Sequence, residues 1–281
     1  MNNSIMFQGT TSDAGKTVIT ALFCRHLMRK GIRVSPFKAQ NLSLNSFVTR
    51  EGREMGISQA FQAWAAGEEP SHLMNPILLK PKGNSGCQIV LEGKPYRDAV
   101  FGRDRMDMDI LLEAISDSFE ALALEYDAIV VEGSGSPAEI NLRHRDIANM
   151  RTAELTDSPV ILIGDIDKGG VFAGLYGTWE LLGEHQHMVK GFIINRFRGD
   201  EGILASGIER LEGMMGIPCL GVVPYVPVRL PAEDSLSMST GEMGRADDVR
   251  KAWMENLDTM LDAIQGHLDL DALEGIMRKG L

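Results

Sequence analysis

A glycine-flanked loop near the N-terminus contains residue types suited to holding phosphate groups. It reads GTTSDAGKT from Gly9 to Thr17 and lies between an apolar run and a helical pattern. Glycines let backbone N–H groups approach phosphate oxygens, Lys16 places a cation on the β- and γ-phosphates, and the Thr17 hydroxyl can bind Mg²⁺. Five residues separate the glycines, one more than is usual. A turn that merely caps the helix is the alternative, but the loop, its position and its flanks together favour phosphate binding. The residues expected to contact a nucleotide here are Thr10, Thr11, Asp13, Ala14, Gly15, Lys16 and Thr17.

Carboxylates stand at the ends of two later apolar runs. Glu132 ends one run and Asp165 ends another, with Asp167 two residues further on. Ligands of open parallel sheets lie at the carboxyl ends of the strands, so we expect Glu132 to bind Mg²⁺ together with Thr17. Asp165 and Asp167 share one face of an extended chain and could join the metal site or position a substrate. Helix capping is the alternative role for these acids.

Three further strand-end residues are candidates for contacts with a nucleotide. Lys38 would place a cation near the transferring phosphate, although a solvated surface lysine is equally compatible with the sequence. Asn195 carries an amide that could pair with a purine edge. Pro224 lies where the last strand could form an apolar wall for the base.

Short apolar runs alternate with longer segments of helical period along most of the chain. Strands are predicted at 4–7, 32–37, 127–131, 159–164, 191–195 and 217–223. Helices are predicted at 16–29, 58–66, 107–126, 171–182 and 203–215. This alternation predicts an α/β, P-loop NTPase-like three-layer fold with a mostly parallel central sheet.

Two segments depart from the alternation. Residues 83–96 are rich in Gly, Asn and Lys, and we interpret them as a hairpin or excursion at one edge of the sheet. Residues 229–248 are loop-like, and apolar residues from Val249 to Leu268 then recur at helical spacing. We expect this C-terminal helical tail, 238–281, to pack on the sheet in preference to a dimer or partner contact.

Composition is that of an ordinary globular protein. The chain has 281 residues, 44% of them hydrophobic and 24% charged, with a formal net charge of −11. An acidic surface disfavours nucleic acid and anionic membranes as partners. The three cysteines form no CxxC pair, which favours a reducing compartment. With neither a signal peptide nor an apolar run of the ~20 residues that a membrane helix needs, a soluble cytoplasmic protein is expected.

A set of ordered sequence blocks resembles a known enzyme family. The blocks are GTTSDAGKT (9–17), PFKAQN (36–41), MNPILLKP (74–81), EGSGSPAEINL (132–142), DIANM (146–150), DIDKGGVF (165–172) and NRFRGD (195–200). Together they closely resemble the N-terminal, ATP-dependent amidoligase domain of cobyric acid synthases, a domain similar to dethiobiotin synthetase. The resemblance runs from the N-terminus to about Ser237, so we expect an ATP-binding amidoligase domain at 1–237 and a helical appendage at 238–281 that does not match the family.

The resemblance implies a reaction and roles for individual residues. In that family a corrinoid carboxylate attacks the γ-phosphate of ATP, and ammonia displaces phosphate from the acyl phosphate to leave an amide. Cobyric acid synthases act in this way on adenosylcobyrinic acid a,c-diamide. The residues that would take catalytic roles are Lys16, Lys38, Asp165 and Asp167. Thr17 and Glu132 would bind Mg²⁺, and Asn195 would read the adenine. The residues that would face the corrinoid are Asn41, Asn45, Glu54, Gln59, Asn75, Ser134 and Asn141.

The source of ammonia and the substrate stay open. Cobyric acid synthases normally continue into a glutaminase domain with a cysteine nucleophile, but Cys24, Cys87 and Cys219 do not lie in a Gly-x-Cys-x-Gly elbow. We therefore expect free ammonia or a separate glutaminase subunit. One alternative is a related ligase for another carboxylate. A second is a P-loop regulatory or partitioning protein, disfavoured because no lysine precedes Lys16 in the loop. A homodimer also stays open.

Overall fold

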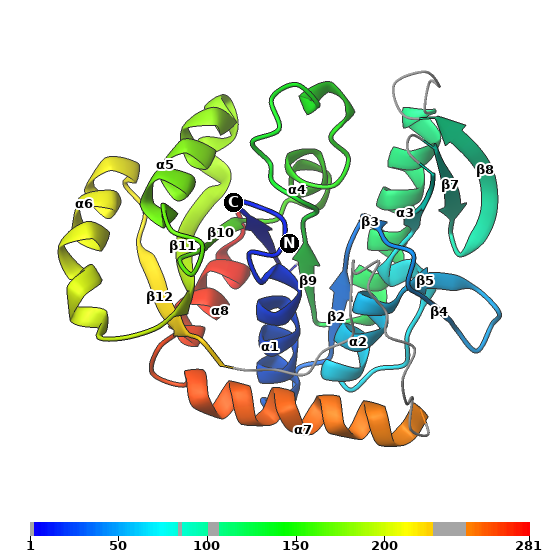
Figure 1. Ribbon diagram of the computed structural model, residues 1–281. Coiled ribbons are helices and arrows are strands. Elements are labelled where there is room, and N and C mark those ends of the chain that lie inside the picture. The colour runs from blue at the N-terminus through cyan, green and yellow to red at the C-terminus, as the bar shows by residue number, and fades with distance from the viewer. Residues whose placement is uncertain (1–2, 84–85, 101–106, 227–245) are drawn as a thin grey trace.

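The computed structural model describes residues 3–83, 86–100, 107–226 and 246–281, and a six-stranded sheet lies at its centre (Figure 1). The strand order is β12-β11-β10-β1-β9-β2, and all neighbours are parallel. The strands are β1 (Ser4–Gly9), β2 (Val34–Phe37), β9 (Ala128–Glu132), β10 (Val160–Asp165), β11 (Val189–Phe197) and β12 (Cys219–Pro224). Each corresponds to one of the apolar runs that predicted a strand.

Helices cover both faces of the sheet, which confirms the predicted three-layer α/β fold (Figure 1). One layer consists of α3 (Met108–Glu125), α4 (Met150–Thr156), α5 (Val171–Leu182) and α6 (Ala205–Met215). The other consists of α1 (Lys16–Arg29), α2 (Ile57–Ala65), α7 (Ala246–Ile264) and α8 (Leu270–Lys279). Alternate strand residues point to opposite faces, so Ile5 and Phe7 pack with the α1 layer and Met6 packs with the other.

A smaller sheet extends the fold beyond β2. It has the order β3-β6-β7-β8, with β3 (Gln40–Leu42), β6 (Ile77–Lys82), β7 (Gly86–Leu91) and β8 (Lys94–Val100), and a separate pair joins β4 (Ser46–Val48) to β5 (Glu54–Gly56). The predicted hairpin is confirmed, because β7 and β8 are antiparallel around Glu92 and Gly93, whose φ angles are 47° and 74°. Short 3-10 helices lie at His72–Met74, Arg143–Arg145, Gly183–Met188 and Glu201–Leu204.

The C-terminal tail packs on the sheet layer as expected, and it forms two helices. Leu257, Leu261 and Leu273 are fully buried or nearly so, and they share one hydrophobic core with α1. The turn between α7 and α8 also pairs with β12, since the carbonyl of His267 accepts a hydrogen bond from the backbone N–H of Val222 at 3.0 Å. The predicted loop at 229–248 lies mostly outside the described residues.

Asp258→Asn is expected to weaken the docking of α7 on α1. The Asp258 carboxylate accepts two hydrogen bonds of 2.7 Å from Arg25 and one of 2.7 Å from Arg29. The hydrogen bond from Arg25 is the main cause that lowers the pKa of Asp258 below its ordinary value. A lowered carboxyl pKa contributes stability that is complete at neutral pH and is lost as the pH falls through the folded pKa, below about pH 4.

Thermal unfolding measures this contribution. At pH 7 we expect Asp258→Asn to cost about 1 kcal/mol, or about 2–4 °C in Tm, and Asp117→Asn on the exposed side of α3 to cost less. The difference between wild type and Asp258→Asn should shrink when the measurements are repeated under acid conditions. A difference that stays constant down to about pH 2 would show that the charge of Asp258 is not what docks the tail.

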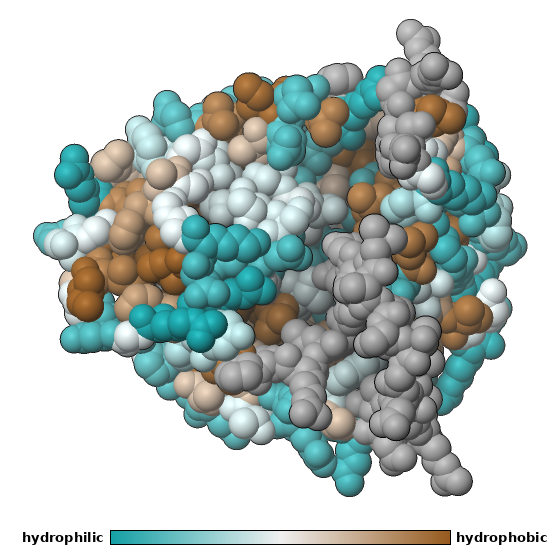
Figure 2. Space-filling model, viewed as in Figure 1, coloured by the Kyte–Doolittle hydropathy of each residue, from teal (hydrophilic) through white to brown (hydrophobic). Residues whose placement is uncertain are grey.

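Polar side chains cover most of the visible face of the molecule (Figure 2). The broadest apolar area on that face lies where Figure 1 places α5 and α6. No helix in the described ranges combines the length and the apolar character needed to cross a membrane.

Candidate functional site

The phosphate loop joins β1 to α1 at the carboxyl edge of the sheet. Gly15 precedes α1 with a φ of 98°, a conformation that favours glycine, and a Cβ atom there would lie 2.1 Å from the amide nitrogen of Asn195. A Cβ atom on Gly9 would lie 2.9 Å from the carbonyl oxygen of Thr11 and 3.0 Å from Nζ of Lys16. Other atoms approach both glycines so closely that neither position has room for a side chain.

Lys16 connects the loop to the segment that follows β9. Its Nζ donates hydrogen bonds to the carbonyl oxygens of Thr11 at 3.1 Å and Gly135 at 2.9 Å. Only 6% of the residue is exposed, so the ammonium is held at the floor of the loop. A phosphate oxygen is a stronger acceptor for this cation than a neutral carbonyl, so a bound phosphate would compete for the same ammonium.

A buried carboxylate gathers three side chains beside the loop. Glu132 is fully buried at the end of β9, and its Oε1 accepts hydrogen bonds from Thr17 Oγ1 and from Lys38 Nζ, both at 2.9 Å. Its Oε2 accepts a hydrogen bond from Gln62 Nε2 at 2.5 Å. The strand order explains this cluster, because β9 lies between β1, which leads to Thr17, and β2, which leads to Lys38. The sequence-predicted residues Thr17, Lys38 and Glu132 are thus brought together.

The donor set of this cluster fits Mg²⁺. Thr17 and Glu132 offer a hydroxyl and a carboxylate oxygen 2.9 Å apart, directly at the phosphate loop. The described residues contain no group of three or more His, Cys, Asp and Glu that could hold a metal ion. Mg²⁺ does not need such a cage, since it is usually held by one or two carboxylates together with substrate phosphates and water.

Gln62 is a site residue that the sequence analysis missed. It lies on α2 with no exposed surface, and its amide nitrogen contacts both the Glu132 carboxylate and, at 3.2 Å, the backbone carbonyl of Thr17. A polar residue on the buried face of a predicted helix was the one available signal. Its position makes it a support for the orientation of Glu132.

Gln62→Leu is expected to raise the Mg²⁺ concentration needed for half-maximal ATP turnover by about 10- to 100-fold, because Glu132, the predicted Mg²⁺ ligand, loses its orienting partner. The measurement is a Mg²⁺ titration at saturating ATP. Thr20→Val is a matched control, since it removes a buried hydroxyl of the neighbouring α1 that has no hydrogen-bond partner. Reduced turnover with an unchanged Mg²⁺ requirement would mean that Gln62 only fills space.

Asn195 is bonded to the phosphate loop, and its expected role of reading a purine edge stays a prediction. Its Nδ2 donates to the carbonyl oxygen of Ala14 at 2.9 Å, and its Oδ1 accepts from the backbone N–H of Arg196 at 2.9 Å. The residue is 4% exposed, so both ends of the amide serve the protein itself. Pro224 is half-buried at the end of β12, level with Phe197 of β11.

The two acids at and just after the end of β10 pair with arginines at and just after the end of β11, and they do not join the Glu132 cluster. Arg196 Nη1 donates to Asp165 Oδ2 at 2.8 Å, and Arg198 Nε donates to Asp167 Oδ1 at 3.0 Å. Arg198 also lies over the ring of Tyr225, 3.4 Å from its centroid. Direct catalytic roles for Asp165 and Asp167 therefore stay predictions, whereas their ion pairs are part of the fold.

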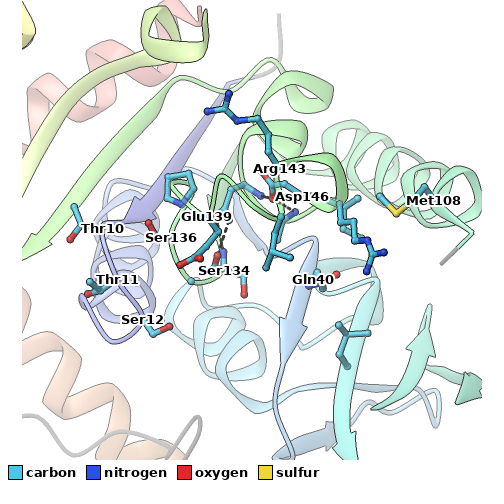
Figure 3. Close-up of a pocket in the computed structure, with 18 of the residues that line it drawn as sticks. Thr10, Thr11, Ser12, Gln40, Met108, Ser134, Ser136, Glu139, Arg143 and Asp146 are labelled. Carbon is cyan, nitrogen blue, oxygen red and sulfur yellow. Dashed lines mark hydrogen bonds between the residues drawn. The ribbon is translucent and has the colours of Figure 1, made fainter. Parts of the chain in front are cut away.

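Two adjoining cavities lie along the loop. The smaller, of about 300 Å³, contains Lys16, Thr17, Lys38, Glu132 and Arg196 in its lining. The larger, of about 840 Å³, lies between the loop and the small sheet. Figure 3 shows Thr10, Thr11 and Ser12 on one side of it, Gln40 and Met108 on the other, and Ser134, Ser136 and Glu139 between them. Ser12, Ser134 and Gly135 line both cavities, so the two cavities share part of their walls.

Two of the residues expected to face the substrate line these cavities. Ser134 lines both, and its backbone is held by the side chain of Asn149 through bonds of 3.1 and 2.8 Å. Asn41 lines the smaller cavity, where its amide nitrogen donates to Ser58 at 3.1 Å and to Gln59 at 2.9 Å.

The remaining residues of that expectation do not line either cavity. Asn75 is 1% exposed, and its amide ties together the backbones of Lys38, Gly56 and Ile77. Gln59 has no exposed surface and supports Asn41. The other three lie outside the cavity linings: Asn45, Glu54 and Asn141.

Glu54 is engaged by the neighbouring strand. It forms an ion pair with Lys80 of β6. Partial burial acts to raise the pKa of Glu54, but hydrogen bonds from Lys80 and Ser46 and the charge of Lys80 together lower it below the ordinary value. This pairing holds β5 against β6 and leaves the carboxylate charged.

A phosphate loop between β1 and α1, with a buried acid on the adjacent strand, defines a P-loop nucleotide-binding protein. The chain belongs to the CobQ/CobB/MinD/ParA nucleotide binding domain family, whose family model matches residues 5–237. This match covers all the strands of the central sheet and the whole Glu132 cluster.

The curated relatives point to one enzyme name. A probable cobyric acid synthase of Methanosphaerula palustris is 52% identical over 240 residues, which are 85% of this chain and 49% of that protein. A probable cobyric acid synthase of Methanothermobacter thermautotrophicus is 50% identical over 96% of this chain and 53% of its own length. The cobyric acid synthase of Vibrio vulnificus is 48% identical over 97% of this chain and 56% of its own length. Among solved structures, the signal recognition particle receptor FtsY of Elizabethkingia anophelis with GDP has a TM-score of 0.47 and 13% identity, over 79% of this chain and 57% of that chain.

These alignments show how much of this chain and how much of each relative is similar. The chain spans about half the length of the curated relatives it matches. The family model ends at residue 237, at the expected domain boundary, whereas the alignment with the Vibrio vulnificus protein covers 97% of this chain and therefore extends into the tail.

Proposed function

We propose that this protein uses ATP to activate carboxylates of a corrinoid for amidation, converting adenosylcobyrinic acid a,c-diamide to cobyric acid. The observation that carries the proposal is that the phosphate cavity and a second cavity of about 840 Å³ lie side by side, with Ser12, Ser134 and Gly135 lining both. A carboxylate bound in the larger cavity would lie next to the terminal phosphate at that junction. The names of the curated relatives support a corrinoid as the substrate.

The lining of the larger cavity suits a large amphipathic molecule. Its apolar part comes from the small sheet and the segment after β9, including Leu79, Val100 and Ile147. Arg145 adds a cation to the same wall, and no hydrogen bond or ion pair of its side chain occurs among the described residues. A volume near the upper end of small-molecule sites exceeds what a small carboxylic acid requires. A corrin ring with carboxylate side chains matches both features.

For this reaction the protein must neutralise the charge of the transferring phosphate and exclude water from the site. A carboxylate is a poor acyl donor because oxide would have to leave, and phosphorylation supplies a better leaving group. Lys16 would hold the transferring phosphate, and Lys38, fixed by Glu132, would add a second cation beside it. Thr17 and Glu132 would hold Mg²⁺, which supplies further neutralisation of the phosphate charge. Asp165 would act through Arg196, which it fixes, and Asp167 would help to handle the acyl phosphate or ammonia.

The contacts of the C-terminal helices with α1 support a division of the chain into two parts. We propose that residues 1–237 form the ATP-binding amidoligase domain and that residues 238–281 support it by holding α1 from outside. Ammonia would be supplied free or by a glutaminase, and it would displace phosphate from the acyl phosphate in water-poor surroundings.

The direct test offers the purified protein ATP, Mg²⁺, ammonia and a panel of corrinoid carboxylates. The expected result is ADP formation together with a corrinoid product whose mass has changed from an acid to a primary amide. Replacing ammonia by glutamine should stop amidation unless a glutaminase is added. Turnover with another carboxylic acid and with no corrinoid would favour the related-ligase alternative. Nucleotide-dependent dimerisation with no acid consumed would favour a regulatory protein.

A further inference from the structure

We propose that Arg196 binds the phosphate chain of the nucleotide, an inference that rests on the proposed ATP site and adds a residue to it. Arg196 follows Asn195 near the end of β11, and it lines the 300 Å³ cavity together with Lys16 and Thr17. It is therefore a third cation at this cavity, beside Lys16 and Lys38.

The backbone of Arg196 is held in an unusual conformation next to the loop. Its φ is 64°, in the left-handed region that non-glycine residues seldom adopt. Its N–H donates to the side chain of Asn195, whose amide nitrogen bonds to Ala14 in the loop. One asparagine side chain thus fixes Arg196 relative to the phosphate loop. Strained non-glycine residues that persist in this way gather at ligand sites.

The side chain of Arg196 is also fixed, and it keeps donors for a ligand. Nη1 bonds at 2.8 Å to Asp165, whose side chain is 2% exposed and whose other oxygen accepts the N–H of Asp167 at 2.9 Å. A guanidinium has five N–H donors, and this bond uses one of them. The Arg196 side chain is 34% exposed, so its remaining donors can reach the cavity. A buried carboxylate that aims a guanidinium in this way is a positioning partner.

Phosphate is the ligand group that this arrangement favours. The other lining residues on the loop are Ser12, Asp13, Gly15, Lys16 and Thr17, the segment whose backbone N–H groups and lysine face phosphates in such loops. A guanidinium offers paired donors that match phosphate oxygens. Arg198, two residues along the same strand, pairs with Asp167 and lies over Tyr225, and it does not line the cavity. It has the same charge and a similar acid partner, so it is a matched control.

Isothermal titration calorimetry of Arg196→Gln, Arg196→Lys and Arg198→Gln tests the inference, with ATP, inorganic tripolyphosphate and adenosine as ligands. Arg196→Gln should weaken ATP and tripolyphosphate by the same factor, about 10- to 100-fold, and should leave adenosine unchanged. Arg196→Lys should recover part of the loss, and Arg198→Gln should match wild type. Thermal unfolding of each variant confirms that the protein is folded.

Two outcomes overturn the inference in different ways. If Arg196→Gln binds tripolyphosphate as tightly as wild type does, Arg196 does not contact phosphate. If the variant loses affinity only for ATP and adenosine, Arg196 contacts the base instead. Folded wild-type protein that binds neither ATP nor tripolyphosphate would contradict the proposed function itself, and with it the role of Arg196.

Discussion

Lys16→Ala is expected to reduce ATP-dependent turnover by about 10³-fold, because it removes the cation that we propose holds the transferring phosphate. In the structure Lys16 is 6% exposed, and its ammonium bonds to the carbonyls of Thr11 and Gly135, which hold it at the floor of the loop. Most of the loss should appear in kcat, since phosphate charge increases during transfer, and a smaller part should appear in the affinity for ATP.

The measurement is ADP release with the accepted carboxylate, together with the dissociation constant of ATP. Lys251→Ala is a suitable control, because Lys251 is an exposed residue of α7 whose ion pair with Glu255 spans 3.8 Å. Its activity should equal that of wild type. Lys16→Ala protein that turned over ATP at the wild-type rate would show that the terminal phosphate is bound elsewhere.

Glu132→Gln is expected to reduce turnover by about 10²- to 10³-fold and also to destabilise the fold. Glu132 has no exposed surface, and the change removes the negative charge 2.9 Å from the ammonium of Lys38, a residue that is 4% exposed. Breaking a buried ion pair from one side costs about 3–5 kcal/mol, because the remaining charge stays out of water. Urea unfolding measures the stability, and a Mg²⁺ titration of turnover measures the metal requirement. Glu120→Gln, on the exposed side of α3, is the control.

A second variant separates the two effects of this change. Combining Glu132→Gln with Lys38→Met removes both charges, so most of the lost stability should return while turnover stays low. Recovery of turnover in the double variant would mean that Glu132 serves only to neutralise Lys38. Failure of both stability and turnover to change in the single variant would contradict the observed cluster.

The sequence predicted the parts of the site that local pattern determines. The phosphate loop follows a strand that an apolar run predicts, and Glu132 ends another such strand. The order of the parallel strands then brings Thr17, Lys38 and Glu132 together. Gln62 could not be placed, since nothing local shows which helix face meets the end of a strand 70 residues further along the chain. Its contact depends on how α2 packs on the loop.

Amide residues show the same limit more sharply. Asn195 and Asn75 look alike in sequence as candidate ligand contacts, yet both use their amides to hold backbone segments in place. Whether an asparagine faces a ligand or a carbonyl is decided by tertiary neighbours. The short strands β3, β4 and β5 were missed because three residues are too few to show a period, and α8 was missed because the turn at Gly266 interrupts the helical pattern.

The contact between the tail and the outer side of α1 has a practical consequence for work on longer relatives. Leu257, Leu261 and Leu273 cover apolar surface of the helix that carries Lys16 at its first position. A fragment cut near residue 237 would open that surface to water and release β12 as a bare sheet edge, which invites self-association. A boundary chosen beyond Lys279 keeps the nucleotide-binding unit intact and is where dissection of the larger enzymes should be made.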